Sequence, residues 1–299
     1  MSHLPDANVT GGTLDTVTEV ANVTEVANVT SLDTVDLVTL ISTLTGITNP
    51  VKCLDHLLEV SMGNISGQSI IDKFGWAEDA NTGAFEAVWG GLTNVAAYPN
   101  TNYTWPSDTA ATMYITSTDD TDKQSYNVQG LDANFLAQNK DVTANGQTAT
   151  AIDGTWTRVY RIENNGTTNN AGVIYVAATA TGTAGKPTDL TKVAGLVAIG
   201  DNQTLMALYT VPAACTGYMI RMRTSCGKAE DFQINLSARQ TGGVFKVKRR
   251  DFLYERSSPI TLDGALVLAA KTDVMISAKS VTTTDRAIAA DFRLLLVAD

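Results

Sequence analysis

Histidine is the residue most often used for proton transfer in enzymes, and this chain has two. His3 stands near the start of the chain and His56 stands shortly after a repetitive segment that ends near residue 50. Neither falls among the strands that we predict from residue 111 onward. A Ser/His/Asp or Cys/His nucleophile system is therefore not available there. The chain also has no CxxC pair, no HExxH and no P-loop. We predict no catalytic residue, no metal site and no cofactor.

Paired carboxylates are the other common catalytic device, and the string TSTDDTDK offers Asp119, Asp120 and Asp122. Two carboxylates are enough to hydrolyse a glycoside when they flank its bond. These three fall at the tip of a predicted hairpin, where Asp is common for its turn-forming hydrogen bonds. Weak Ca²⁺ binding is an alternative, but the run lacks the spacing and the terminal Glu of an EF-hand. We rank a depolymerase acting through these residues as the least favoured function.

Aromatic side chains gather in Gly- and Asn-rich surroundings before residue 110. We expect these rings to fill the core beneath irregular loops, and we call them plugs. The more specific alternative is that they form an exposed platform for binding carbohydrate. The plug candidates are Phe74, Trp76, Phe85 and Trp89. For a glycan-binding function, the candidate contacts are Trp89, Tyr103 and Trp105.

Charge is distributed unevenly along the chain, whose net charge is −10. Residues 1–50 hold six acidic residues and no Lys or Arg, whereas residues 217–256 hold nine basic residues against four acidic ones. Lys246, Lys248 and Arg250 are expected on one face of a strand over 244–254, with Phe245 and Val247 on the other. That face is either simply solvated or a docking face for an acidic partner, such as the acidic segment of a neighbouring subunit. Neither end of the chain resembles the dense basic surface of a nucleic-acid-binding protein.

An aliphatic residue recurs at every third position near the N-terminus. The series is Leu14, Val17, Val20, Val23, Val26, Val29, Leu32, Val35, Val38, Ile41, Leu44 and Ile47. An α-helix advances 3.6 residues per turn, so this spacing smears the apolar residues around a helix and gives no single face. A β-strand sends successive members to opposite faces. Neither ordinary element suits the pattern.

Three structures suit a period of three: a polyproline-II-like chain, a triangular β-helix, and several chains wound about one axis. A disordered acidic tail is the remaining interpretation. Solenoid units need about three or more stacked repeats to bury a core, and this segment is short, so identical neighbours are the natural source of further layers. We therefore expect residues 1–50 to be an acidic oligomerisation stem of a homo-oligomer, most simply a trimer.

Beyond Pro50 the sequence predicts a short helix within Val51–Val60 and an irregular collar, so that residues 51–110 connect the stem to the globular part. From residue 111 the pattern alternates with period 2 and is broken by Asn, Gly, Asp and Thr turns, giving about a dozen short strands. The fold class is mainly β, an antiparallel β-sandwich or jelly-roll-like domain over 111–299 that divides into one or two β subdomains. The apolar runs Met206–Val211 and Leu294–Val297 are expected to be central strands.

The segments GNISGQSIIDKFGW, VQGLDANFLAQNKDVTANGQTAT, WTRVYRIENNGTTNNAGVIYV, IGDNQTLMALYTVPAACTGYM and DFRLLLVAD cover much of residues 63–299. In these segments the chain resembles virion structural proteins of marine and freshwater tailed bacteriophages, which often carry Val/Thr/Asp triplet repeats before such a region. The resemblance is one of general pattern and transfers no functional residue. It implies a part of the virion, assembled in the host cytoplasm, without indicating which part.

The leading expectation is thus a non-enzymatic trimeric component of the phage exterior, either fibre-like or a capsid decoration or cement protein. Its partners are copies of itself and other virion proteins of the capsid, neck or tail. The alternative is a receptor-binding tip that recognises a host-surface glycan. No run of about 18 apolar residues is present, so we expect no membrane insertion, and we expect no signal peptide.

Overall fold

The computed structural model describes most of the chain beyond residue 54. The described residues are 55–80, 82–90, 103–180, 182–226, 231–254, 257–281 and 286–299. Residues 1–54 are not among them, so the predicted stem lies outside the described part. Everything below concerns the unit that runs from Asp55 to Asp299.

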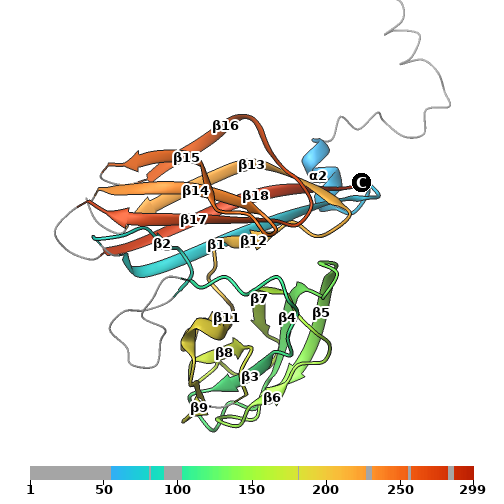
Figure 1. Cartoon of the computed structure of the whole chain (residues 1–299), viewed down its shortest axis with the longest axis vertical. Helices are drawn as coiled ribbons and strands as arrows, with labels where there is room; N and C mark the ends of the chain where they lie inside the picture. Colours follow the sequence, from blue (N-terminus) through green and yellow to red (C-terminus); the bar gives the residue numbers. More distant parts are fainter. Residues whose placement is uncertain are drawn as a thin grey trace, which may run out of the picture. The chain divides into compact units, whose positions relative to one another are not determined.

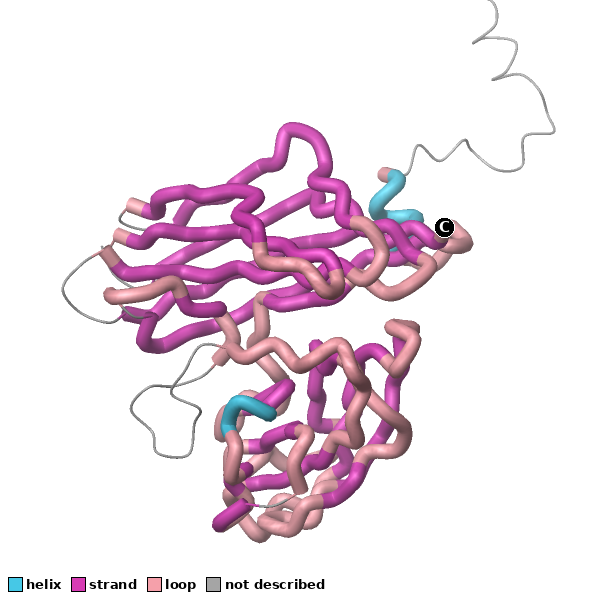
Figure 2. The backbone as a smooth tube through the Cα atoms, in the orientation of Figure 1, coloured by secondary structure: helices cyan, strands magenta, loops and turns pink. Residues whose placement is uncertain are grey.

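A short helix and a four-stranded sheet, sheet A, begin the fold (Figures 1 and 2). The helix α2 spans His56–Ser61, and the Asp55 side chain caps it by accepting a hydrogen bond from the amide of Leu57. Sheet A is antiparallel in the order β1-β18-β13-β16. Its strands are β1 (Gln68–Ala80), β13 (Cys215–Cys226), β16 (Ser257–Leu268) and β18 (Arg286–Ala298). Among the described residues no helix is long and apolar enough to cross a lipid bilayer.

The second sheet, sheet B, runs in the order β12-β17-β14-β15, and the short strand β2 also pairs with β17. Its strands are β2 (Glu86–Ala87), β12 (Leu208–Thr210), β14 (Phe232–Gln240), β15 (Lys246–Leu253) and β17 (Thr272–Ser280). All of its ladders are antiparallel. The expectation of a mainly β, antiparallel fold is confirmed.

The order of strands in sheets A and B is that of a jelly roll. If only the strands of these two sheets are counted and β2 is set aside, the first to eighth strands in chain order are β1, β12, β13, β14, β15, β16, β17 and β18. Sheet A then reads first, eighth, third, sixth, and sheet B reads second, seventh, fourth, fifth. This is the arrangement that two nested Greek keys give when a long antiparallel hairpin folds over on itself.

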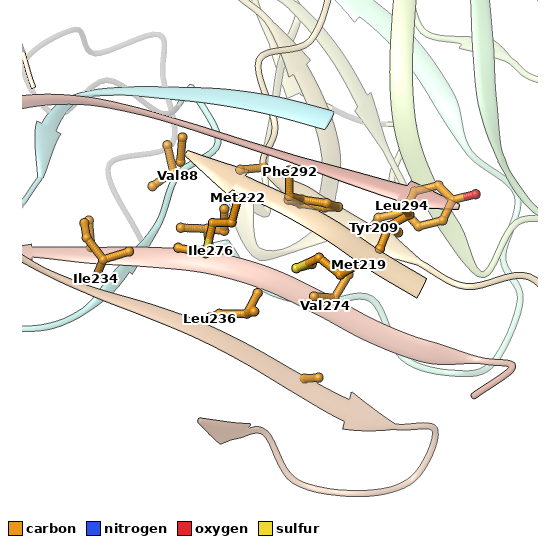
Figure 3. Packing of buried hydrophobic residues seen from close by; sticks show 14 of the residues in the cluster. Val88, Tyr209, Met219, Met222, Ile234, Leu236, Val274, Ile276, Phe292 and Leu294 are labelled. Atoms are coloured by element: carbon orange, nitrogen blue, oxygen red, sulfur yellow. The ribbon is translucent and has the colours of Figure 1, made fainter. Parts of the chain in front are cut away.

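The core of the jelly roll lies between the two sheets (Figure 3). On β18 every second residue from Ile288 to Leu296 is buried, and the residues between them are more exposed. They pack against the inward residues of β14 and β17, including Ile234, Leu236 and Ile276. Each large apolar side chain that is fully buried in this way contributes about 1.5–3 kcal/mol. The period-2 alternation in the sequence is thus the direct cause of this two-layer packing.

The second position of the jelly roll is one edge strand built from two distant pieces of chain. Ala87 pairs with Ser277 and Leu208 pairs with Met275, so β2 and β12 lie end to end along β17. The junction is closed by the amide of Ala207, which donates to the carbonyl oxygen of Val88 at 2.8 Å. Residues 89–206 are therefore an insertion within a single strand.

The insertion folds as a second, smaller β unit. One of its sheets has the order β11-β8-β3-β6 and the other the order β5-β4-β7, with a two-stranded ribbon of β9 and β10 beside them. The strands are β3 (Tyr114–Ser117), β4 (Ser125–Leu131), β5 (Ala137–Thr143), β6 (Thr150–Ala151), β7 (Arg158–Asn164), β8 (Ile174–Ala177), β9 (Gly182–Thr183), β10 (Lys186–Pro187) and β11 (Val193–Val197), and a 3₁₀ turn covers Leu190–Lys192. The two sheets bury a separate core that includes Tyr126, Trp156, Ile162 and Val176.

Two expectations from the sequence fail in the jelly roll. The irregular collar expected within 51–110 contains β1, a 13-residue strand. Its inward residues include Lys73, Gly75 and Ala77, so the sequence shows no apolar pattern for the inward face. A side chain at Gly75 would collide with the carbonyl oxygen of Val88 and the amide nitrogen of Ala207, because β1 crosses close to the strand junction.

The other failed expectation concerns the apolar run Met206–Val211, which was predicted to be a central strand. Its strand, β12, lies at the edge of sheet B. The run is apolar because both of its faces are buried, with Tyr209 in the jelly-roll core and Met206 and Leu208 in a cluster shared with the insertion. Leu294–Val297 does belong to an interior strand, since β18 lies between β1 and β13.

Candidate functional site

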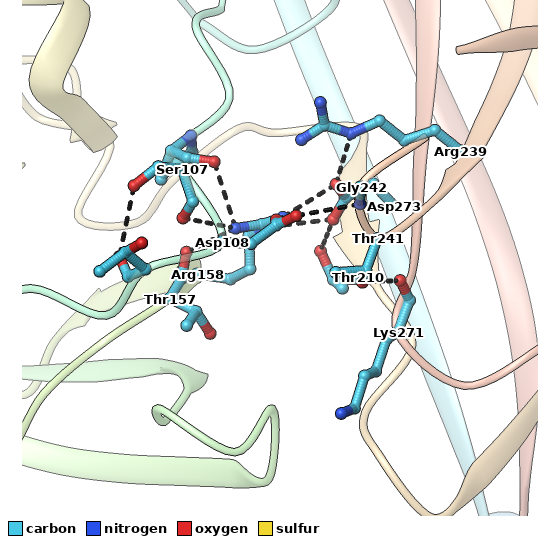
Figure 4. Close-up of polar contacts among 12 residues, drawn as sticks. Ser107, Asp108, Thr157, Arg158, Thr210, Arg239, Thr241, Gly242, Lys271 and Asp273 are labelled. Atoms are coloured by element: carbon cyan, nitrogen blue, oxygen red, sulfur yellow. Dashed lines mark hydrogen bonds and ion pairs between the residues drawn. The ribbon is translucent and has the colours of Figure 1, made fainter. Parts of the chain in front are cut away.

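A buried carboxylate joins the insertion to the jelly roll (Figure 4). Asp273 on β17 is fully buried and accepts four hydrogen bonds. Its Oδ1 accepts from Arg158 Nε at 2.9 Å and from the Thr210 hydroxyl at 2.5 Å, and its Oδ2 accepts from an Arg158 terminal nitrogen at 3.0 Å and from Arg239 Nε at 2.7 Å. Arg158 belongs to the insertion, whereas Thr210, Arg239 and Asp273 belong to the jelly roll.

Arg158 finds a partner for each part of its guanidinium group. Besides Asp273, it donates to Asp108 Oδ1 at 2.6 Å and to the carbonyl oxygens of Pro106, Ser107 and Thr157. Asp108 in turn accepts from the amide of Gly242 at 3.0 Å, which ties the insertion to the loop after β14. A buried ion pair is tolerated when its remaining donors and acceptors are satisfied in this way.

The pKa values of this cluster follow from these contacts. Burial alone opposes the charge on Arg158, but the hydrogen bonds from its guanidinium to Asp273 and Asp108 outweigh burial and raise its pKa. Partial burial likewise opposes ionisation of Asp108, and the hydrogen bond from Arg158 holds the pKa of that carboxyl below its usual value. Both groups are therefore charged over a wide pH range.

An aromatic ladder covers the cluster. Ring centroids are 5.0 Å apart from Trp89 to Tyr103, 5.3 Å from Tyr103 to Trp105 and 5.5 Å from Trp105 to Phe245. The guanidinium of Arg239 lies 4.8 Å from the Phe245 ring centroid and 5.5 Å from that of Trp105. These cation–π contacts help to keep water from the ion pair.

The prediction that Trp89, Tyr103 and Trp105 contact a glycan is wrong, because these rings are buried or partly buried in the ladder. Trp89 is 4% exposed and Tyr103 is 7% exposed, and the Tyr103 hydroxyl donates to the carbonyl oxygen of Ala194. Trp105 is partly buried against the same cluster. These rings pack the joint between the two β units, so they do not present a face to a sugar. Of the plug candidates, Trp89 is buried but Phe74 and Trp76 are not.

The predicted docking face of Lys246, Lys248 and Arg250 is divided by a β-bulge. The register of β15 against β14 shifts between Leu236 and Ser237, so that Lys246 is opposite Ala238 whereas Arg250 is opposite Asn235. Ala238 points into the core and Asn235 away from it, and therefore the expectation that the three cations share one face is wrong. All three side chains are nonetheless exposed, and Lys246 and Lys248 line a hollow of about 520 Å³ with Val244 and Val267.

The acidic run in the hairpin has structural roles. Asp119 accepts hydrogen bonds from the amide and hydroxyl of Thr121, which forms a turn. Asp122 is buried and accepts from the Ser117 hydroxyl and from the amides of Ala171 and Gly172. Within the described ranges no three His, Cys, Asp or Glu side chains form a group that would hold a metal ion.

A groove on sheet A was not singled out as a site by the sequence. Trp76 on β1 lies between two hollows, of about 510 and 400 Å³, and both hollows share Trp76 and Leu205 as walls. We call them together the Trp76 groove. Phe74 and Trp76 are 40% and 36% exposed there, and Arg223 and Asp291 line the larger hollow. The alternating spacing of Phe74 and Trp76 in the sequence could have indicated that the two rings share one face of a strand. That this face is the outer face of sheet A follows only from the place of β1 in the fold.

Lys73 is a second buried charge between the insertion and the jelly roll. It is 3% exposed, and its ammonium donates to the carbonyl oxygen of Tyr160 on β7 and lies 5.8 Å from that ring's centroid. Burial, and to a smaller extent the nearby charge of Arg161, lowers the pKa of Lys73 to about 7, with Glu163 acting in the opposite sense. The side chain therefore gives up its proton near neutrality.

No protein-family model and no curated protein matches the chain. Among solved structures, it is similar to infectious bursal disease virus, Gx strain, with 9% identity, a TM-score of 0.19 and coverage of 77% of this chain and 76% of that chain. A VP2 subviral particle of infectious bursal disease virus matches with 8% identity, a TM-score of 0.21 and coverage of 78% and 73%. TM-scores of this size do not establish a common fold.

The predicted stem positions, Leu14 to Ile47, lie outside the described residues, and their role as an oligomerisation stem stays a prediction.

Replacing Asp273 with Asn should destabilise the protein by about 3–5 kcal/mol, because Arg158 and Arg239 then remain buried or half-buried without a carboxylate. Urea unfolding measures the loss. The matched control is Asp153→Asn, which removes an ion pair to Lys140 whose side chains are 86% and 40% exposed and should cost under about 1 kcal/mol. Equal losses in the two variants would contradict a stabilising role of the buried Asp273 carboxylate.

Stability should rise between pH 7 and pH 9 because of Lys73. Its pKa in the folded protein, about 7, is below that in the unfolded chain, so the unfolded state holds more protons in this range and folding gains as pH increases. Urea unfolding at several pH values should show that Lys73→Met flattens this rise and that Lys140→Met, at an exposed position, leaves it intact. An unchanged slope in Lys73→Met would show that another group is responsible.

Proposed function

We propose that the protein is a non-enzymatic structural component of a virion, exposed on the exterior of a tailed bacteriophage. The observation that carries the proposal is the jelly-roll strand order of sheets A and B. This double-sheet arrangement recurs in viral capsid domains, in lectins and in cupins. Fold alone does not fix function, so this step is an analogy. It agrees with the phage virion proteins that the sequence resembles between residues 63 and 299.

The joint between the two β units supports a structural role. Asp273, Arg158 and Asp108 connect the insertion to β17 and to the loop after β14 by hydrogen bonds that are largely shielded from water. The aromatic ladder and the apolar cluster around Met206 and Tyr175 add packing on the same side. A joint with this many satisfied buried contacts holds the insertion in one orientation, as a particle surface requires.

Assembly as a homotrimer is the second part of the proposal. The triplet pattern from Leu14 to Ile47 suits several chains wound about one axis, and each buried Val there contributes about 1.5 kcal/mol or more. Exposed cations on β15 provide a complementary surface for the acidic segment of another copy, although the bulge spreads them over two faces. A fibre at the neck or tail and a decoration or cement protein on the capsid both fit this plan.

Immunogold electron microscopy tests the virion role. An antibody raised against residues 55–299 should label intact particles released from lysed host cells, at a fixed place on the head, neck or tail. Pre-absorbing the antibody with the purified protein is the control and should abolish the label. Gold confined to cell debris, with clean particles, would overturn the proposal.

Size-exclusion chromatography with light scattering tests the stem. The full chain should elute as an oligomer of three subunits, and the joint substitution Val23→Asp, Val26→Asp and Val29→Asp should give monomers because charge replaces the apolar series. The matched control changes Thr18, Thr24 and Thr30 to Asp, which adds the same charge between the apolar positions. A monomeric wild type, or equal effects of the two sets, would contradict the triplet-repeat assembly.

A further inference from the structure

The Trp76 groove is built from residues that alternate on three neighbouring strands of sheet A. Phe74 is opposite Asp291 on β18, which is opposite Arg223 on β13. The next outward-facing row is Trp76, Ala289 and Ser225. Ala289 and Ser225 are short, so the second row is low beside Trp76 and is bounded by the larger side chains of the first row. This difference in height makes the hollow of about 510 Å³.

Two exposed aromatic rings on one face of a strand are the groove's apolar surface. Residues two apart on a strand are about 7 Å from each other, so Phe74 and Trp76 form one platform. Leu205 completes the wall and also borders the second hollow, beyond Trp76. Leaving about two fifths of each ring exposed is unfavourable in water, and a ligand that covers them removes that apolar area from solvent.

The polar groups of the groove include both a donor and an acceptor. Arg223 is exposed and has no hydrogen-bond or ion-pair partner among the residues that the structure describes. Asp291 contacts Arg221 through Oδ1 at 3.3 Å, and within the same described part its Oδ2 has no partner. Because these side chains are cross-strand neighbours, they match a ligand whose adjacent hydroxyls both donate and accept.

We propose that the Trp76 groove binds a neutral oligosaccharide. The apolar C–H face of a sugar ring stacks on Trp76 and Phe74, and its hydroxyls take hydrogen bonds from Arg223 and give them to Asp291. A purely apolar ligand would leave these two charged groups without partners, which is costly. Polyanionic glycans are disfavoured because the groove holds Asp291, Glu78 and Asp201 against Arg223.

The size of the groove also favours a saccharide over a second protein. The two hollows of about 510 and 400 Å³ lie within the usual range for small-molecule sites. They continue past Trp76 on both sides, so a linear chain of sugars has room to extend from Arg223 toward Glu78 and Asp201. Binding of a saccharide in the groove does not depend on the proposed virion role.

Binding of the full-length protein to an array of defined oligosaccharides tests the inference. The array carries neutral hexasaccharides of glucose, mannose, galactose, rhamnose and N-acetylglucosamine, and acidic ones built from hexuronate and sialic acid. Neutral chains should bind, and titration calorimetry with the best of them should show that Trp76→Ala weakens affinity by at least about tenfold. Phe74→Ala and Arg223→Met provide independent variants if Trp76→Ala melts early, and each should weaken binding several-fold.

Phe252→Ala is the matched control, because Phe252 is a 48% exposed aromatic residue on β15 outside the groove, and it should leave affinity within about twofold. Four outcomes would overturn the proposal. On the array, these are a failure of every neutral chain to bind and binding of acidic chains alone. In calorimetry, it is binding that Trp76→Ala, Phe74→Ala and Arg223→Met all leave unchanged. The fourth is loss of oligomerisation in Trp76→Ala when the wild type binds no glycan. The last would identify the face as a contact between copies.

Discussion

The fully buried carboxylate of Asp273 joins the insertion to the jelly roll. It is fully buried on β17 and holds one arginine from the insertion and one from the jelly roll. A buried ion is expensive unless its partners are close and its hydrogen bonds are complete. The surrounding structure meets that requirement with Thr210, three backbone carbonyl oxygens for Arg158, and rings that exclude water. The insertion's orientation is therefore tied to a specific hydrogen-bond geometry as well as to apolar contact.

Much of the fold was predictable from the sequence, because alternation reports directly on a sheet with one buried face. The period-2 pattern expected beyond residue 111 is found in β13 and β18, where buried residues alternate with more exposed ones. The strand β1 was missed because Lys73, Gly75 and Ala77 occupy its inward positions, and the first two are determined by distant partners. Lys73 needs Tyr160, and Gly75 needs the space taken by Val88 and Ala207.

The candidate site was less predictable, for the same reason. Aromatic residues are conspicuous in a sequence, but whether a ring is buried depends on elements far along the chain. Tyr103 is covered by residues of β11 and of the split edge strand. Trp76 faces outward, although it lies fewer than thirty positions before Tyr103 in the sequence. The cations of β15 were placed on one face by counting residues, and one bulge opposite Leu236 and Ser237 reversed part of that count. Local spacing cannot report an irregularity that the partner strand imposes.

The split edge strand has a consequence for the order of folding. β2 and β12 reach their places on β17 only when Val88 and Ala207 meet, which closes a loop formed by residues 89–206. Closing an unstructured loop of that length costs about 4 kcal/mol in chain entropy. Once the insertion has its own core, its two ends are held near each other and most of that cost is already met. If the smaller unit folds first, completing the second strand of the jelly roll therefore costs less chain entropy.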